Sequence, residues 1–117
     1  MPTIAAAMSG VPFKLQDTQS IGNGTTLAIP PSFRNHTFII TAAANVTSGA
    51  ITLETSNDPT DANTWAALAT AITVTAGADL MTQVTGILNF IRARISTTIA
   101  GGAAPSVTVI YEGAKSY

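Results

Sequence analysis

The sequence predicts an all-β protein, folded as a single jelly-roll-like antiparallel β-sandwich of about eight short strands. Three observations favour this fold class. Short stretches rich in β-branched and aromatic residues recur along the 117 residues, turn signals separate them at intervals of roughly 8–12 residues, and two of the stretches alternate between apolar and polar side chains. No linker or repeat divides the chain, so we expect one sandwich domain over residues 11–117.

The N-terminal residues 1–10 ("MPTIAAAMSG") are small and apolar and show no period. We expect a flexible arm there, because chain termini stay disordered unless the fold holds them. The segment is short and has no basic stretch at its start, which argues against a signal peptide.

The strands that follow are bounded by turn residues. Pro12 places the first strand at a sheet edge or at a strand start, Asn23-Gly24 is a strong turn signal, and Pro30-Pro31 ends the second strand. For the segment Trp65–Ile72, which contains much Ala and Leu, a two-turn helix is the alternative to a strand. The expected strands span residues 11–16, 25–29, 36–43, 50–55, 65–68 (continuing or restarting over 71–75), 80–85, 90–96 and 106–112.

Two strands alternate most clearly. In Ala50–Thr55 the apolar side chains share one face and Glu54 lies on the other, and in Phe90–Ser96 ("FIRARIS") Arg92 and Arg94 lie opposite the apolar side chains. The strand rise places the two arginines about 7 Å apart on one face of the sheet. They either pair with a carboxylate inside the protein or bind an acidic partner surface.

The composition excludes several classes of function. Only 9% of the residues are charged, against about 25% in a typical soluble domain, and five basic residues with a net charge of −1 make no electrostatic footprint for nucleic acid. The chain has no cysteine and no apolar run of the roughly 20 residues that a membrane span needs. A surface of Thr, Ser, Asn and small apolar side chains is typical of a protein that docks to others.

The stretch "ETSNDPTDANTW" (54–65) places three of the six acidic residues beside the only tryptophan. Asp58 and Asp61 offer oxygen ligands, but the spacing does not match an EF-hand, and Asx turns around Pro59 explain the residues without a metal. Trp65 either stacks on a sugar or, as we expect, fills the core at the start of a strand.

No catalytic constellation is visible in the sequence. His36 is the only histidine, it has no nucleophile motif near it, and a structural or exposed role is the expectation. No pattern indicates a cofactor or a metal site, and we expect no enzymatic activity.

Taken together, five pieces resemble a widespread group of small virion structural proteins of tailed bacteriophages. They are Ser20–Leu27 ("SIGNGTTL"), Ser48–Asp58 ("SGAITLETSND"), Thr64-Trp65, Phe90–Ile95 ("FIRARI") and Pro105–Val109 ("PSVTV"). The resemblance covers roughly residues 15–113. This chain departs from it at residues 58–63 ("DPTDAN"), where members often have a shorter turn.

The resemblance implies a non-enzymatic capsid decoration, or cement, protein. Such a protein would be made in the host cytoplasm, bind the major capsid protein lattice on the outer surface of the head, and associate with itself as a dimer or trimer. Candidate partner contacts are Arg92, Arg94, Asp58, Asp61, Thr3 and Ile4, the last two because an apolar arm can add a strand to a neighbouring chain. The alternative is a tail or fibre module that binds a host receptor or carbohydrate.

Overall fold

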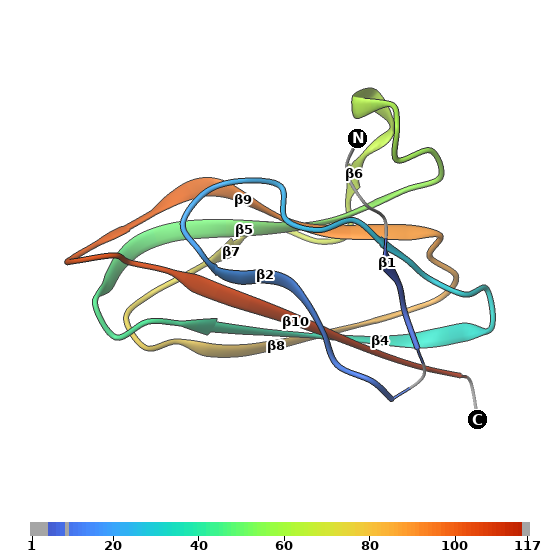
Figure 1. The fold of residues 1–117 in the computed structure, drawn as a ribbon, viewed down its shortest axis with the longest axis horizontal. Coiled ribbons are helices and arrows are strands. Elements are labelled where there is room, and N and C mark those ends of the chain that lie inside the picture. The colour runs from blue at the N-terminus through green and yellow to red at the C-terminus, as the bar shows by residue number, and fades with distance from the viewer. Residues whose placement is uncertain (1–4, 9, 116–117) are drawn as a thin grey trace.

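The computed structural model describes residues 5–8 and 10–115, which form an all-β structure (Figure 1). A single short 3-10 helix, η1 (Ala62–Thr64), interrupts the strands of this part of the chain. In chain order the strands are β1 (Ala5–Ala6), β2 (Phe13–Gln19), β3 (Leu27–Ala28), β4 (Phe33–Ala42), β5 (Val46–Ser56), β6 (Ala66–Ala67), β7 (Ile72–Thr73), β8 (Asp79–Thr85), β9 (Phe90–Gly101) and β10 (Val107–Lys115).

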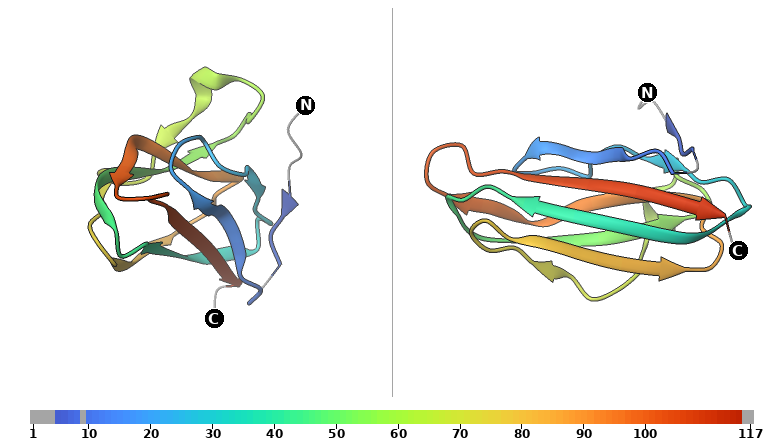
Figure 2. Two further views of the ribbon diagram at one scale, coloured as in Figure 1. Left: turned by 60° about the vertical axis from the view of Figure 1, so that its left-hand side comes forward. Right: turned by 90° about the horizontal axis from the view of Figure 1, so that it is seen from below.

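The strands form two sheets that face each other across the core. Sheet A has the order β1-β3-β9-β5-β6, with β7 also paired to β5, and sheet B has the order β2-β10-β4-β8. The described pairings are antiparallel apart from β1 with β3, which is parallel. Figure 2 shows the two layers from two sides, and its right-hand view shows β8 as the outermost strand of sheet B. The predicted all-β class with two antiparallel sheets is therefore confirmed.

Alternate side chains from both sheets meet between them. Phe38 and Ile40 of β4 face inward, as do Ile51 and Leu53 of β5, and none of the four is more than 2% exposed. Burying one such side chain stabilises the fold by about 1.5–3 kcal/mol. The two-residue period that predicted β5 thus corresponds to burial on the core face.

Several strands are longer than the sequence predicts. The strand expected over residues 50–55 already begins at Val46, as β5, and pairs with β9 through several register shifts. Gly49 has a φ of 150°, and a Cβ there would collide with Ile99 of β9. Glycine is common both at β-bulges and in turns. The sequence pattern therefore placed the start of this strand too late.

The described part of the N-terminal segment is bonded to the sandwich. Ala5–Ala6 forms β1 beside β3, the Ala7 amide donates to the Ala28 carbonyl at 2.8 Å, and the Gly10 amide donates to the Gly113 carbonyl at 2.9 Å. Where we expected an arm separate from the domain, the chain therefore contributes an edge of sheet A. The predicted contacts Thr3 and Ile4 lie outside the described residues.

The segment Trp65–Ile72 forms no helix. It contains β6 and the first residue of β7, two short stretches that pair with different parts of β5. Leu68 packs against the core between them, and its amide donates to the Leu53 carbonyl. Of the two alternatives for this segment, a helix or a strand that restarts, the structure shows the strand that restarts.

His36 has a structural role between the sheets. It is 1% exposed, its Nδ1 lies 2.7 Å from the Tyr111 hydroxyl, and its Nε2 lies 2.8 Å from the Gly86 carbonyl oxygen. The carbonyl oxygen can only accept, so Nε2 carries a hydrogen, and in the neutral imidazole Nδ1 accepts from Tyr111. Gly113 leaves room for this arrangement, because a Cβ there would collide with the Tyr111 hydroxyl and the Phe33 ring.

The Tyr111 hydroxyl predicts a loss of stability in alkali. Burial raises its pKa well above the ordinary value of 10.0. Above pH 10 the unfolded chain therefore loses a proton that the folded chain retains, so the stabilisation is complete below pH 10 and declines as the pH rises. We expect the unfolding free energy to fall by up to about 1.4 kcal/mol per pH unit in this range, measured by urea denaturation.

The matched variant is Tyr111→Phe, which keeps the ring and removes the hydroxyl. It should remove this part of the alkaline slope and cost about 1–3 kcal/mol at neutral pH, because Nδ1 of His36 loses its buried donor. An alkaline slope equal to that of the unaltered protein would contradict the assignment.

Candidate functional site

The loop between β5 and β6 is held by its own polar side chains. The Asp58 carboxylate accepts from the Thr60 amide at 3.2 Å and the Thr60 hydroxyl at 2.7 Å, and Asp61 caps η1 by accepting from the Asn63 amide at 3.0 Å. Both aspartates are exposed. They hold the turn as expected, and their remaining carboxylate surface faces solvent.

A hydroxyl pair closes the base of this loop. The Thr64 hydroxyl lies 2.6 Å from the Ser56 hydroxyl and 2.6 Å and 2.7 Å from the carbonyl oxygens of Asp58 and Asp61. Figure 1 shows the loop projecting from the body of the sandwich beside β6. These hydrogen bonds fix the conformation of the loop at its base. They therefore also fix the position of Trp65, which follows Thr64 directly.

Glu54 lies at the centre of a charged cluster on the face of sheet A that points away from the core. Its carboxylate accepts from Nε of Arg92 at 2.8 Å and from Nε of Arg94 at 3.1 Å, one bond to each oxygen. The Glu54 side chain is 8% exposed, that of Arg92 15% and that of Arg94 37%. Of the two alternatives left open by the sequence, internal pairing is therefore observed.

Trp65 belongs to the same cluster and does not fill the core. The guanidinium carbon of Arg92 lies 4.1 Å from the centre of its ring, a cation–π contact, and the side chain is half-buried. The expectation of a core tryptophan was wrong. The loop carries Trp65 over the outer face of sheet A, where the Arg92 side chain also pairs with the Glu54 carboxylate.

The cluster carries an excess of positive charge. Two guanidinium groups surround one carboxylate, so the group of Glu54, Arg92, Arg94 and Trp65, here called the outer cluster, has a formal charge of +1. Arg94 is its most exposed charged member, and an accessible guanidinium can form paired hydrogen bonds with a carboxylate of another protein. The outer cluster is thus suited to an acidic contact, with Arg92 largely covered and Arg94 the more accessible guanidinium.

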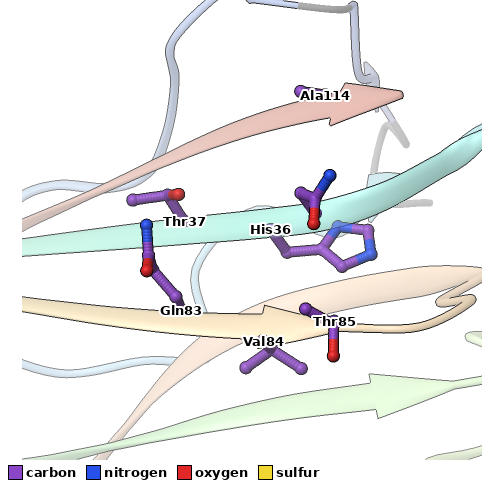
Figure 3. A pocket seen from close by; sticks show the side chains of 7 residues that line it. His36, Thr37, Gln83, Val84, Thr85 and Ala114 are labelled. Atoms are coloured by element: carbon purple, nitrogen blue, oxygen red, sulfur yellow. The ribbon is translucent and has the colours of Figure 1, made fainter. Parts of the chain in front are cut away.

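A second feature is a hollow of about 350 Å³ on sheet B, where the ends of β4, β8 and β10 lie side by side. Figure 3 shows Thr37 and Gln83 next to each other across β4 and β8, and these two residues are register partners. The lining is Asn35, His36, Thr37, Gln83, Val84, Thr85 and Ala114. Since both nitrogens of His36 are engaged by Tyr111 and Gly86, the imidazole is not free to act as a base there.

Sequence reasoning missed one buried polar residue that positions the rest. Gln16 is 2% exposed, and its side-chain amide donates to the Ala93 carbonyl at 2.7 Å and to the Gly22 carbonyl at 3.1 Å. It links β2 of sheet B to β9 of sheet A, and β9 carries both arginines. No signal in the sequence indicated this role, because alternation with Leu15, which is 1% exposed, would place Gln16 on the outer face.

The outer cluster predicts a specific stability effect. Glu54→Gln removes the charge between two arginines, and we expect it to cost about 2–4 kcal/mol, because breaking a covered ion pair leaves uncompensated charge. The control is Lys14→Ala, which removes an exposed pair with Asp17 at 3.5 Å and should cost less than about 1 kcal/mol. Urea denaturation measures both, and equal small losses would contradict the central role of Glu54.

The fluorescence of the only tryptophan reports the stacking. In Arg92→Met we expect a shift of the emission to longer wavelength and stronger quenching by acrylamide, because Trp65 loses the side chain that covers its ring. Arg94→Met also loses a bond to Glu54 but does not touch the ring, and its emission should match that of the unaltered protein. Identical spectra for both variants would refute the contact.

Comparison with known proteins adds no family to this geometry. No protein-family model, no curated protein and no solved structure matches the chain. Within residues 5–8 and 10–115 no helix is long and apolar enough to cross a membrane, and no group of three or more His, Cys, Asp or Glu side chains gathers into a potential metal site.

Proposed function

We propose that the protein is a virion structural protein of a tailed bacteriophage, a capsid decoration or cement protein that binds the major capsid protein lattice on the outer surface of the head. It acts by binding and carries out no catalysis. The proposal starts from the resemblance of five sequence pieces, and it is supported by the strand order and by the outer cluster that three of these pieces build.

The order of the strands supports a jelly roll. The chain changes sheets at nearly every connection, so that β2, β4, β8 and β10 lie in sheet B while β3, β5, β7 and β9 lie in sheet A. Within sheet B the last strand, β10, lies between β2 and β4, and within sheet A β9 lies between β3 and β5. This interleaving is what two Greek keys folded on each other produce, an arrangement common in viral capsid and lectin domains.

The observation that carries the proposal is the convergence of three separate sequence pieces on one surface. "SGAITLETSND" supplies Glu54, "TW" supplies Trp65, and "FIRARI" supplies Arg92 and Arg94. These four residues contact one another on the face of sheet A that points away from the core. The same pieces also supply the core residues Ile51, Leu53 and Ile91, so they specify both the core and this surface. Arg94 is the accessible charged residue of the surface.

An apolar row on the outer face of the other sheet suits the same role. Across sheet B, Ile110 of β10 is the register partner of Ile39 of β4, which is the partner of Met81 of β8, and threonines flank this apolar row on β4. Charged residues lie at the margin of this row: Lys14 of β2 is the register partner of Ile110, and Glu112 and Asp79 lie opposite the flanking threonines. A capsid subunit can pack on the apolar row while these charges stay at the rim of the contact. Each bound copy then stabilises the assembled shell, because it binds the shell and not the dissociated subunits.

A second candidate is a tail or fibre module that binds a receptor or carbohydrate. It is favoured by the half-buried position of Trp65 on the outer face and by the projecting loop with exposed Asp58 and Asp61. In that case a Trp65→Ala variant loses binding to host cells, and the protein has no affinity for heads. The two candidates thus differ in which particle the protein occupies.

The test uses heads of the encoding phage assembled without this protein. We expect the purified chain to co-sediment with these heads and to raise the temperature at which they release DNA, since binding to the assembled shell opposes its opening. Arg94→Ala should lower the affinity about tenfold, because it removes the exposed guanidinium of the outer cluster.

Arg34→Ala is the matched control, since it removes one exposed positive charge that belongs neither to the outer cluster nor to the apolar row of sheet B, and it should leave occupancy unchanged. Absence of binding to heads, with binding to tails or host cells instead, would exclude the cement role. Equal binding by both alanine variants would leave the cement role standing and exclude the outer cluster as its contact.

A further inference from the structure

Strand β8 ends sheet B with an open edge. It contains seven residues (Asp79–Thr85) and pairs with β4 on one side, and no other strand of the described chain pairs with it. Its sequence, "DLMTQVT", contains no proline, glycine or lysine, and its pairing with β4 shows no register shift. Such residues and bulges are what natural proteins use to prevent an edge from pairing with another chain.

The other edges are short or covered. β1, β6 and β7 have two residues each. The pairing of β2 with β10 contains bulges, and Thr18 of β2 has a positive φ. The Leu15 carbonyl of β2 already accepts a hydrogen bond from the Thr25 amide. The part of β9 beyond β3 is covered as well, since the Gln16 side chain bonds Ala93 and the Gly22 carbonyl accepts from the Ile95 amide. The β8 edge is thus the exception among the described edges.

The direction of the free backbone groups follows from two hydrogen bonds. The Ala78 carbonyl accepts from Ala42, and the Gly86 amide donates to Arg34, so the even-numbered residues of β8 point their amides and carbonyls toward β4. Backbone groups alternate along a strand, so the odd-numbered residues point theirs outward. The open edge therefore presents the amides and carbonyls of Asp79, Met81, Gln83 and Thr85.

We propose that this edge pairs with β8 of a second copy of the chain, antiparallel, around a two-fold axis at Thr82. This register places Asp79 opposite Thr85 of the second copy and Met81 opposite Gln83. All the outward backbone groups are then used, giving about eight interchain hydrogen bonds. The two sheets B become one continuous sheet, and the shared patch is self-complementary, as a two-fold interface requires.

The side chains fit this register. On the core side, Leu80 lies opposite Val84 of the second copy, and both are partly exposed apolar residues at the margin of the core. On the other side, Met81 is 65% exposed and lies beside Gln83 of the second copy, which lines the hollow of sheet B. The only charge on the strand, Asp79, faces a threonine and not its own copy, so no like charges meet.

Pairing should form in the isolated protein, whatever the protein binds in its biological setting. Sedimentation analysis from about 1 μM to about 300 μM is expected to show a concentration-dependent dimer. Gln83→Pro removes one outward amide per copy and leaves the bonds to β4 intact, so the dimer should weaken roughly tenfold or more. Gln83→Thr keeps the amide and serves as the control.

A cross-link tests the register. The chain has no cysteine, and Thr82→Cys places two thiols at the axis with Cα atoms about 4.5 Å apart, within the range that a disulfide spans. Thr85→Cys, on the same strand, places them about 20 Å apart and should not cross-link. A monomer at every concentration overturns the proposal, and so does a dimer that Gln83→Pro leaves unchanged or that cross-links equally through both cysteines.

Discussion

The carboxylate of Glu54 is the charge on which the outer face of sheet A depends. It is almost fully covered, and a covered carboxylate is tolerated only when its partners are charged and well aligned. Arg92 and Arg94 meet this condition because they alternate along β9 directly beside β5, with Glu54 and Arg92 as register partners. Arg92 in turn provides the cation on which Trp65 rests, so the position of the loop follows from the same ion pair.

The uncharged polar groups in the interior are likewise buried only together with hydrogen-bond partners. His36 is satisfied by Tyr111 and Gly86, and Gln16 by two carbonyl groups of other segments. Among the described residues that are not exposed, no buried side-chain nitrogen or oxygen lacks a partner. These bonds join segments far apart in the chain, and so they favour one arrangement of the two sheets over others in which a polar group would remain unpaired.

The surfaces divide the possible contacts between the two sheets. Sheet A presents a localised positive site, which favours a partner with carboxylates, whereas sheet B presents a row of apolar side chains and one open strand edge. In the proposed function, electrostatic contacts would select the partner, and backbone pairing with apolar burial would set the spacing of the copies. A protein that binds a repeating lattice as a dimer would use both.

Much of the fold could be predicted because two-residue periodicity is local. Ile51 and Leu53 on one face, and Arg92 and Arg94 on another, follow from alternation within single strands, and Asp58 and Asp61 follow from turn chemistry. The jelly-roll topology remains a proposal supported by strand order. The extension of β5 through Gly49 could not be predicted, since a bulge glycine and a turn glycine have the same composition.

The sequence by itself determined the strand content, the opposition of charged and apolar faces, and the absence of cysteine chemistry. The tertiary structure alone decided that Trp65 lies on Arg92 and not in the core, that Arg92 and Arg94 share Glu54, and that β8 has an open edge. The reason is physical. Which faces meet, and which edges remain unpaired, depends on pairing between residues distant in the chain, and no local pattern contains that information.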